Sequence, residues 1–383
     1  MLRKVILSFT GLVAAVAIAS CSTNTNPISI GPNFPTATLY AANSTQNSVE
    51  IYPPGTASGS GPQNVIGGGS TALNGPQYLT FDASKNLWVS NFTQNSGGNI
   101  VEIAATATGN VFPLLTANQS NLTVAHPRGL AFVNQIVGGV TTTLLVVANV
   151  DPTQKTFANE LLFLSNASGL LSTNFTIAGP ATGLNVPSGV AVDANQNIYV
   201  ANLQGASVEQ FAIPTAAPIP TPTPTPAATL TPSPMPSATP TPTPTPIPIA
   251  TATPINAAPQ FTIAGGATGV TTPTSVAVDS AGNVYVSDQG NVTLGVAPAI
   301  LVFPPNLSGT VTSAPVRKIS GAATLLFAPT DVKLDSTGKI YVADSTAAGA
   351  GVIYVFAAGS TGNTAPSATF TSPGNAIGIG ILP

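Results

Sequence analysis

Charged residues are scarce in this sequence. They make up 5% of its 383 residues, whereas hydrophobic residues make up 43%. This composition excludes a charge-rich disordered chain. The 9 Lys and Arg against 12 Asp and Glu give a formal net charge of −3, so the sequence also lacks the basic surface of a nucleic-acid-binding protein. We therefore expect no nucleic-acid partner.

Cysteine and histidine each occur once, as Cys21 and His126. A disulfide within the chain is therefore excluded, and so is zinc held by several histidines and cysteines. A Ser-His-Asp assembly would have to be built on His126, and the sequence contains no Gly-x-Ser-x-Gly nucleophile elbow.

What the sequence does contain is a repeated unit, most regular in Val276–Asp288. It reads Val-Ala-Val-Asp-Ser-Ala-Gly-Asn-Val-Tyr-Val-Ser-Asp, which is two runs of strand length around a turn. One such hairpin is not stable alone in water, so the copies are expected to pack side by side. The other copies are Leu79–Asn91, Val190–Asn202, Val332–Asp344, a looser one at Leu130–Asn149, and one divided between Leu39–Asn43 and Ala376–Ile379.

An aspartate begins the turn in four copies, as Asp279 does in the unit just quoted. Its carboxylate can accept backbone N–H bonds within its own turn, so we interpret these aspartates as structural. A calcium role is the alternative, although the turns lack a dense Asp-x-Asp-x-Asp cluster. The four turn aspartates are Asp82, Asp193, Asp279 and Asp335, and the aromatic residues expected to fill space between sheets are Trp88, Tyr199, Tyr285 and Tyr341.

Each unit continues with two more short apolar runs. The predicted third strands are Val49–Tyr52, Ile100–Ile103, Leu161–Leu164, Val208–Phe211, Ile300–Phe303 and Val352–Phe356. The predicted fourth strands are Asn64–Ile66, Asn110–Phe112, Asn174–Ala178, Gln260–Ala264, Val316–Ser320 and Ala368–Thr371. Four strands in each of six units predict an all-β, six-bladed β-propeller of four-stranded antiparallel blades. The divided unit predicts closure by pairing of the N- and C-terminal strands, which removes free sheet edges.

Residues 1–20 have the form of a lipoprotein-type signal peptide. Arg3 and Lys4 precede an uncharged, mostly apolar run that ends Ile-Ala-Ser-Cys21 and resembles the bacterial lipobox. We expect Cys21 to be lipidated, and a plain signal with an incidental cysteine is the alternative. Residues 21–37 then form a polar tether. The predicted location is extracytoplasmic, with a lipid anchor in the bacterial cell envelope, at the outer membrane or cell surface.

The composition changes sharply in the Pro/Thr-rich, low-complexity segment 214–259, where the proline density prevents sheet pairing. The pattern of Phe175–Pro187 recurs at Phe261–Pro273, a displacement of 86 residues, and removing the 46 residues of the segment leaves 40, an ordinary blade length. We therefore predict an insertion within a single propeller formed by residues 38–213 and 260–383. A boundary between two domains is the alternative.

The recurring pattern Pro-x-x-Val-Ala-Val-Asp-x-x-Gly-Asn-x-Tyr-Val-x-Asp/Asn resembles the NHL-repeat family of six-bladed propellers. The wider group that this resemblance brings in includes binding scaffolds, streptogramin-lyase-like enzymes and gluconolactonase-like hydrolases, so it leaves function open. A gluconolactonase-like metal site would need a glutamate ligand. Glu50, Glu102 and Glu209 all fall in predicted third strands, away from the axis.

In propellers of this kind, the loops that enter the first strands and leave the second strands lie on one face, where ligands bind. Polar side chains around that opening could bind a cation or a sugar. Alternatively, each caps its strand end or starts a turn. The residues concerned are Asn43, Asn91, Asn149, Asn202, Asp288 and Asp344.

His126 and Arg128 flank a proline just before a first strand, on the same predicted face. An imidazole beside a guanidinium could bind an anion or act in acid–base catalysis, and ordinary loop residues are the alternative.

Two functions are compatible with these patterns. The first is a lipid-anchored, extracytoplasmic binding or scaffolding propeller, a monomer without catalytic residues or cofactor, that engages a protein or glycan through its loops. The second is a metal-dependent hydrolase or lyase of the gluconolactonase-like or streptogramin-lyase-like type, in which Asp288 and Asp344 hold a divalent cation.

Overall fold

The computed structural model describes residues 37–93, 97–118, 124–150, 159–167, 170–214 and 254–382. They belong to one compact unit, residues 32–383. The predicted signal peptide, Cys21, nearly all of the predicted tether and most of the Pro/Thr-rich segment lie outside the described residues. Within the described ranges, no helix is long and apolar enough to cross a membrane.

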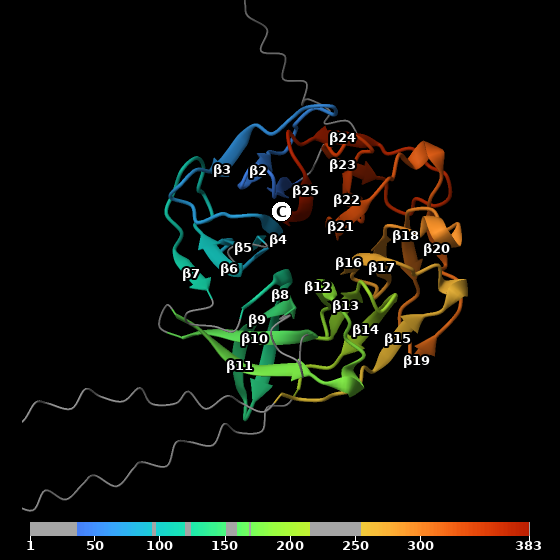
Figure 1. Cartoon of the computed structure of the whole chain (residues 1–383), viewed down its shortest axis with the longest axis horizontal. Helices are drawn as coiled ribbons and strands as arrows, with labels where there is room; N and C mark the ends of the chain where they lie inside the picture. The colour runs from blue at the N-terminus through green and yellow to red at the C-terminus, as the bar shows by residue number, and fades with distance from the viewer. Residues whose placement is uncertain are drawn as a thin grey trace, which may run out of the picture. The chain divides into compact units, whose positions relative to one another are not determined.

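Six sheets form six blades, each with its first strand nearest the axis (Figure 1). Blade 1 contains β25 (Ala376–Leu382), β1 (Thr38–Asn43), β2 (Ser48–Tyr52) and β3 (Asn64–Gly67). Blade 2 contains β4 (Pro76–Phe81), β5 (Leu87–Thr93), β6 (Gly97–Ile103) and β7 (Leu115–Asn118). Blade 3 contains β8 (Pro127–Val137), β9 (Val140–Val150), β10 (Asn159–Ala167) and β11 (Leu170–Ala178).

The other three blades follow the same order. Blade 4 contains β12 (Pro187–Val192), β13 (Ile198–Asn202), β14 (Ser207–Phe211), β15 (Phe261–Ala264) and the added β19 (Gly309–Val311). Blade 5 contains β16 (Pro273–Val278), β17 (Val284–Asp288), β18 (Ala299–Phe303) and β20 (Arg317–Ile319). Blade 6 contains β21 (Pro329–Leu334), β22 (Ile340–Ser345), β23 (Gly351–Phe356) and β24 (Ala368–Thr371).

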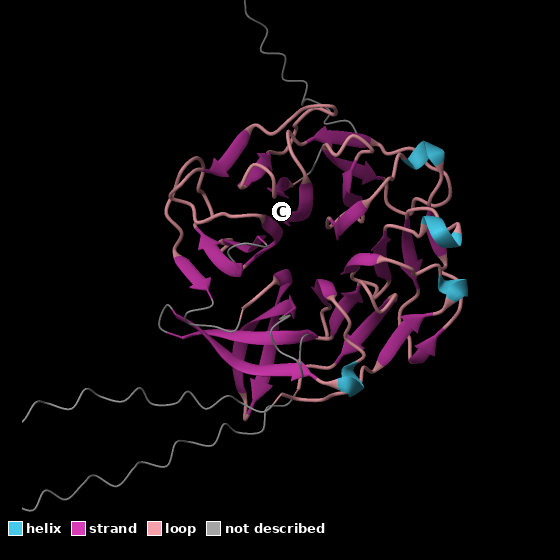
Figure 2. Cartoon of the chain, viewed as in Figure 1, coloured by secondary structure: helices cyan, strands magenta, loops and turns pink. Residues whose placement is uncertain are grey.

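The described helices are four single 3-10 turns in loops (Figure 2). They are η1 (Pro180–Thr182), η2 (Gly266–Thr268), η3 (Val292–Leu294) and η4 (Ala322–Thr324). The prediction of an all-β, six-bladed propeller is therefore confirmed.

The ring closes as predicted, because the last strand of the chain lies beside the first. β25 pairs antiparallel with β1, in a register that places Leu39 opposite Ile381 and Tyr40 opposite Gly380. The pairing gives β1 a neighbour on both sides, since β2 occupies its other edge. Closure thus removes an exposed inner edge that would otherwise bind other strands.

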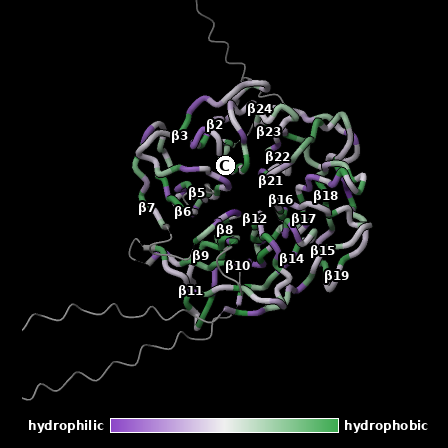
Figure 3. Tube along the Cα trace, in the orientation of Figure 1, coloured by the Kyte–Doolittle hydropathy of each residue, from purple (hydrophilic) through white to green (hydrophobic). Residues whose placement is uncertain are grey.

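The apolar core is divided among the six interfaces between neighbouring blades, and each of six clusters draws its side chains from two adjacent blades. Tyr199 of blade 4, for example, packs with Val276 of blade 5. Apolar residues accordingly follow the strands within the ring (Figure 3). Burying a large apolar side chain contributes roughly 1.5–3 kcal/mol, so a blade without neighbours loses most of its stabilisation.

The aspartate turns have the expected hydrogen bonds. Asp279 Oδ1 accepts the backbone N–H groups of Ala281 at 3.0 Å and Asn283 at 2.8 Å, and Oδ2 accepts the Tyr285 hydroxyl at 3.2 Å. In blade 2, the indole N–H of a tryptophan replaces the tyrosine hydroxyl and donates to the turn aspartate at 3.2 Å. In both blades, the aspartate side chain therefore links the turn to an aromatic residue of the core.

A second device joins neighbouring blades at their outer edges. The connection between third and fourth strands reaches back and pairs in parallel with the fourth strand of the preceding blade, and we call this connection the clasp. In blade 6 the clasp residue is Gly362, whose N–H donates to Lys318 O of β20 at 2.6 Å and whose carbonyl accepts from Ser320 N at 3.1 Å. In blade 5 the clasp is long enough to form β19, which pairs with β15.

One predicted strand is wrong for this reason. Asn110–Phe112 was expected to be the fourth strand of blade 2, but it lies at the clasp of that blade, where Gly109 pairs with Ile66 of blade 1. The fourth strand is β7, which begins at Leu115. A short run with Gly and Asn has no local preference for its own sheet over the neighbouring one, so pattern alone could not decide.

The Pro/Thr-rich segment belongs to the connection between β14 and β15, which also contains the clasp of blade 4. β14 before it and β15 after it pair antiparallel in one sheet. Pro214 O accepts a hydrogen bond from Gln135 Nε2 at 2.7 Å, and Ile255 pairs with Ile177 of blade 3. Both ends of the segment are therefore fixed at the edge of the ring.

Candidate functional site

The six predicted rim residues lie at or within two residues of the ends of their second strands, one in each blade, and all are at most 1% exposed. Their side-chain oxygens accept hydrogen bonds from loop backbone. Asp288 Oδ2 accepts from the N–H groups of Thr271 at 2.8 Å and Thr272 at 2.9 Å. Asn149 Oδ1 accepts from those of Ala125 and His126, each at 3.1 Å. These bonds hold the loops that enter the first strands.

The rim residues differ in their electrostatic surroundings. Asn43 and Asn149 each donate to a buried third-strand glutamate, at 2.6 Å to Glu50 and 2.7 Å to Glu160. Asp344 instead carries its own charge and accepts from two backbone N–H groups at 2.7 and 3.0 Å. Burial raises the pKa of Asp344 to about 6, and the backbone donors partly oppose the shift.

The predicted site residues are not gathered into one metal cluster. Among the described residues, no three His, Cys, Asp or Glu side chains lie close enough together to hold a metal ion. His126 and Arg128 lie on either side of Pro127, both half-buried. The His126 ring packs on Phe92 with centroids 4.0 Å apart. The ligand-binding roles of the rim residues, His126 and Arg128 stay predictions.

Sequence reasoning missed the residue that occupies the axis, Tyr78. Its hydroxyl lies 3.0 Å from Ser188 Oγ in blade 4, 3.0 Å from Thr274 O in blade 5 and 3.2 Å from Thr330 O in blade 6. One side chain from blade 2 therefore links three blades across the ring. Burial and the nearby Asp331 carboxylate raise the pKa of Tyr78 to about 12, whereas Arg128 and the Ser188 hydrogen bond lower it.

A sequence signal for Tyr78 did exist. In four of the other five units, the first-strand position that corresponds to Tyr78 holds a small residue, and in the fifth it holds Asp331. The residues at this position are Gly129, Gly189, Ser275, Asp331 and Gly378. A tyrosine in a column of small residues at the crowded centre of a ring indicates a side chain that crosses the axis.

Asp331 is the second axial residue that the sequence analysis did not single out. Its buried carboxylate accepts from Ser275 Oγ at 2.6 Å in blade 5 and from Ile379 N at 2.8 Å in blade 1. Lys333, whose side chain is 24% exposed, forms an ion pair with it at 3.2 Å. Because a buried unpaired charge is costly, these three partners are what allow a carboxylate on the axis.

Beyond Tyr78 and Asp331, a cavity of about 360 Å³ opens at the hairpin-turn end of the axis, opposite the predicted rim. First-strand side chains line it, among them Phe81, Phe132, Val192 and Leu334, and Lys333 is its single charged lining residue among those described. The cavity is therefore mostly apolar.

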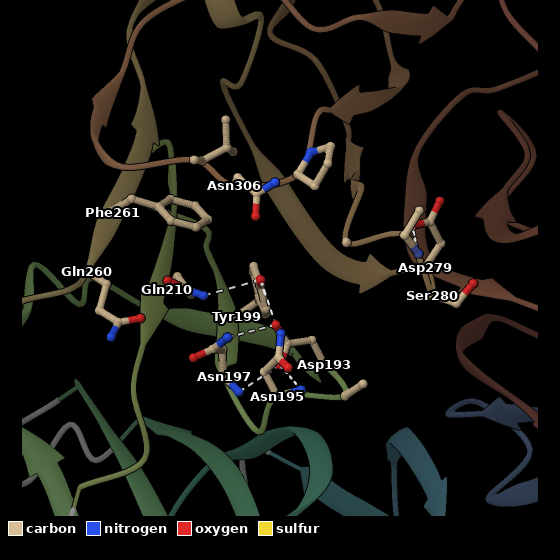
Figure 4. Close-up of a pocket in the computed structure, with 15 residues that line it drawn as sticks. Asp193, Asn195, Asn197, Tyr199, Gln210, Gln260, Phe261, Asp279, Ser280 and Asn306 are labelled. Carbon is tan, nitrogen blue, oxygen red and sulfur yellow. Dashed lines mark hydrogen bonds between the residues drawn. The ribbon is translucent and has the colours of Figure 1, made fainter.

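A more polar groove of about 330 Å³ lies between blades 4 and 5, also at the hairpin-turn end (Figure 4). Blade 4 contributes Asn195 and Gln260, and blade 5 contributes Ser280 and Asn306, all four exposed. The turn aspartates of both blades, Asp193 and Asp279, and the rings of Tyr199 and Phe261 complete the wall. No basic side chain is among the described lining residues.

The hydrogen bonds within the groove show which polar groups are already engaged. Asp193 Oδ2 accepts from Tyr199 Oη at 3.0 Å and Asn197 Nδ2 at 2.9 Å. Gln210 Nε2 donates to the same tyrosine oxygen at 3.2 Å. The carboxylate is thus held by its own turn, and the exposed amide and hydroxyl groups on the two walls are the ones that face solvent (Figure 4).

The strands and their closure define the class of this protein, a six-bladed β-propeller. Within that class, a model of the beta-propeller repeat matches residues 261–287, which include β15 and β16 and support a propeller built from such repeats. No curated protein gives a significant match to the sequence.

Several solved structures resemble the chain. A protein of unknown function from Bacteroides caccae is 10% identical, with 90% of this chain and 98% of that chain covered and a TM-score of 0.48. PQQ-bound aldose sugar dehydrogenase from Streptomyces coelicolor is 12% identical (82% and 87% covered, TM-score 0.45), and a streptogramin B lyase is 9% identical (80% and 86%, TM-score 0.39). At these identities and scores, function must be argued from this chain's own residues.

Proposed function

We propose that this chain is a lipid-anchored, extracytoplasmic propeller that acts as a monomeric binding module for a neutral, hydroxyl-rich ligand, a glycan, held in the groove between blades 4 and 5. The observation that carries the proposal is the pairing of exposed amide and hydroxyl side chains on facing walls, Asn195 and Gln260 against Ser280 and Asn306. Such groups donate and accept hydrogen bonds with sugar hydroxyls.

Two further features support this ligand class. The volume of about 330 Å³ lies at the small end of the ~300–1,000 Å³ range of small-molecule sites. Asp193 and Asp279 give the groove a negative potential that no described lining residue offsets, so an anionic ligand would be repelled. A neutral glycan satisfies both conditions.

The test is glycan binding by the mature chain, screened on an array of neutral and acidic glycans and measured by calorimetry. Gln260→Ala and Asn306→Ala should each weaken binding about five-fold or more, since one neutral hydrogen bond is worth roughly 1 kcal/mol. Gln46→Ala removes an equally exposed amide on the opposite face and should leave the affinity unchanged. Binding that ignores both groove variants, or no glycan binding at all, would reject the proposal.

The alternative function is a metal-dependent hydrolase or lyase that uses Asp288 and Asp344. Both carboxylates are buried and hold loop backbone, so a cation would compete with those donors. Turnover of a lactone or ester that requires a divalent cation and disappears in the Asp288→Asn, Asp344→Asn double variant would establish the enzyme and displace the binding module.

A further inference from the structure

Five of the six outer strands are covered by a clasp from the next blade. The bonds repeat one geometry, in which two alternate residues of the outer strand supply a carbonyl and an N–H. In β3, Val65 O accepts from Gly109 N at 2.7 Å and Gly67 N donates to Gly109 O at 3.0 Å. In β24, Thr369 O accepts from Gly59 N at 2.6 Å and Thr371 N donates to Ser60 O at 3.1 Å.

The exception is β7 of blade 2. Its inner edge is paired in the usual way, because Leu114 N donates to Glu102 O at 2.7 Å as Val316 N donates to Val302 O in blade 5. By the same register, the outward groups are the Thr116 carbonyl and the Asn118 N–H. Within the described part of the chain, neither has a backbone partner.

The reason is the shape of blade 3, which would supply the missing clasp. Its third and fourth strands are joined by a tight hairpin in which Ala167 already pairs with Leu170, so no described segment is left to reach back. β11 contributes Leu171 to the apolar cluster that contains Leu115 and Ala117, but β11 and β7 are not paired through their backbones within the described residues. The side chains of blades 2 and 3 thus pack while the outer edge of β7 stays open.

The flank of this edge is apolar and uncharged. Phe112 is 81% exposed and Leu114 is 60% exposed, and residues 112–118 read Phe-Pro-Leu-Leu-Thr-Ala-Asn. Proteins commonly protect an open edge with a lysine or another charge. Here the charges Arg317 and Lys318 lie on β20, whose edge is clasped, and none lies on β7.

We propose that the outer edge of β7 is a docking site for an extended segment of another protein, which adds to blade 2 as a parallel strand. The clasps of the other blades define the occupant. It runs parallel to the edge strand, and one of its residues donates an N–H to the Thr116 carbonyl and accepts from the Asn118 N–H, as Gly109, Ile255 and Gly362 do at the clasped strands. It also presents apolar side chains to Phe112 and Leu114. This surface is independent of the glycan groove, so either proposal can fail alone.

Hydrogen exchange of the unliganded chain tests the open edge. The Asn118 amide should exchange about 100-fold faster or more than the amide of Ser320, which occupies the same position under a clasp. Equal protection of the two amides would mean that the edge is already covered, and would overturn the proposal.

A displayed library of random ten-residue peptides tests the occupant. Selected peptides should slow exchange at Asn118 and bind about ten-fold less tightly to Asn118→Pro, which removes the outward N–H and leaves the inner ladder intact. Thr116→Ala should bind normally, because its carbonyl remains. Peptides insensitive to Asn118→Pro, or a library without Asn118-dependent binders, would overturn the proposal. If Asn118→Pro fails to fold, the exchange measurement on the unaltered chain decides.

Discussion

At the scale of single residues, Glu50 and Glu209 occupy equivalent third-strand positions in blades 1 and 4 but have different partners. Glu50 Oε2 accepts from Tyr52 Oη at 2.9 Å. Glu209 Oε2 is buried without a hydrogen-bond partner, because Phe211 stands where blade 1 has that tyrosine. Burial raises the pKa of Glu209 to about 7, although Ser207 and Asn202 donate to the other oxygen.

This difference predicts a pH dependence of stability. The folded-state pKa of about 7 lies above the reference value of 4.5, so the folded chain holds the proton more tightly. The contribution of Glu209 is therefore fully present below about pH 4.5 and is lost as the pH rises through about 7. Glu209→Gln should abolish this loss, which is on the order of 3 kcal/mol. Urea unfolding between about pH 4.5 and 8.5 measures it.

Phe211→Tyr is the matched second variant, since it restores the donor that blade 1 has. It should lower the pKa of Glu209 and raise the free energy of unfolding above neutral pH by about 1–2 kcal/mol. Asp344 also loses stabilisation as the pH rises through about 6, but it is present in every variant and cancels in the difference. Identical pH profiles for the three chains would show that Glu209 is not buried in its neutral form.

At the scale of elements, the first strands approach each other so closely that glycine is required at some positions. A Cβ on Gly129 of β8 would lie 2.4 Å from Ser188 O and 2.5 Å from Val190 N, both backbone atoms of β12. No flexible side chain is available there to move aside. Glycine at this position is therefore a condition for the close approach of β8 and β12.

Gly129→Ala should accordingly destabilise the chain by about 3 kcal/mol or more, or prevent folding, because two strands must separate. Gly69→Ala is the control, since a Cβ there meets nothing within 4 Å and its backbone needs no positive φ. Thermal unfolding followed by circular dichroism measures both. A Gly129→Ala chain as stable as the control would mean that the blades slide apart at little cost.

The sequence predicted the elements whose contacts join residues close together in the chain, and it missed those whose contacts join different blades. The hairpin of β16 and β17 was predictable, because Asp279 and its turn are satisfied by residues at most six positions away. The clasp at Gly109 was not, because it pairs with Ile66 of another blade. The rim residues lie near the ends of the second strands, as predicted, whereas their bonds to loop backbone depend on loops with no recognisable pattern.

At the scale of the whole molecule, closure makes a short C-terminal strand more important than a long internal segment. β25 pairs with β1, packs against β21 and β4, and supplies Ile379 N to the buried Asp331. The residues on either side of the Pro/Thr-rich segment are instead held independently, Pro214 by Gln135 and Ile255 by β11.

Two shortened chains should therefore differ in stability, and the one that loses fewer residues should be the less stable. Removing residues 376–383 should cost most of the stability or cause aggregation, because β1 becomes an open edge and the Asp331 carboxylate loses a donor. Replacing residues 215–253 by a Gly-Ser linker of about ten residues should leave the melting temperature almost unchanged. The reverse order would contradict closure as the source of stability.

The sequence by itself determined the repeat, its strands and turns, and the closure of the ring, because each depends on apolar alternation and turn residues that recur every few tens of positions. Only the tertiary structure decided what stands on the axis and which edge is open. Tyr78 meets partners 110, 196 and 252 positions away, and such contacts leave no local pattern. The same is true of the clasps, since a strand edge is satisfied or exposed according to which neighbouring blade reaches it.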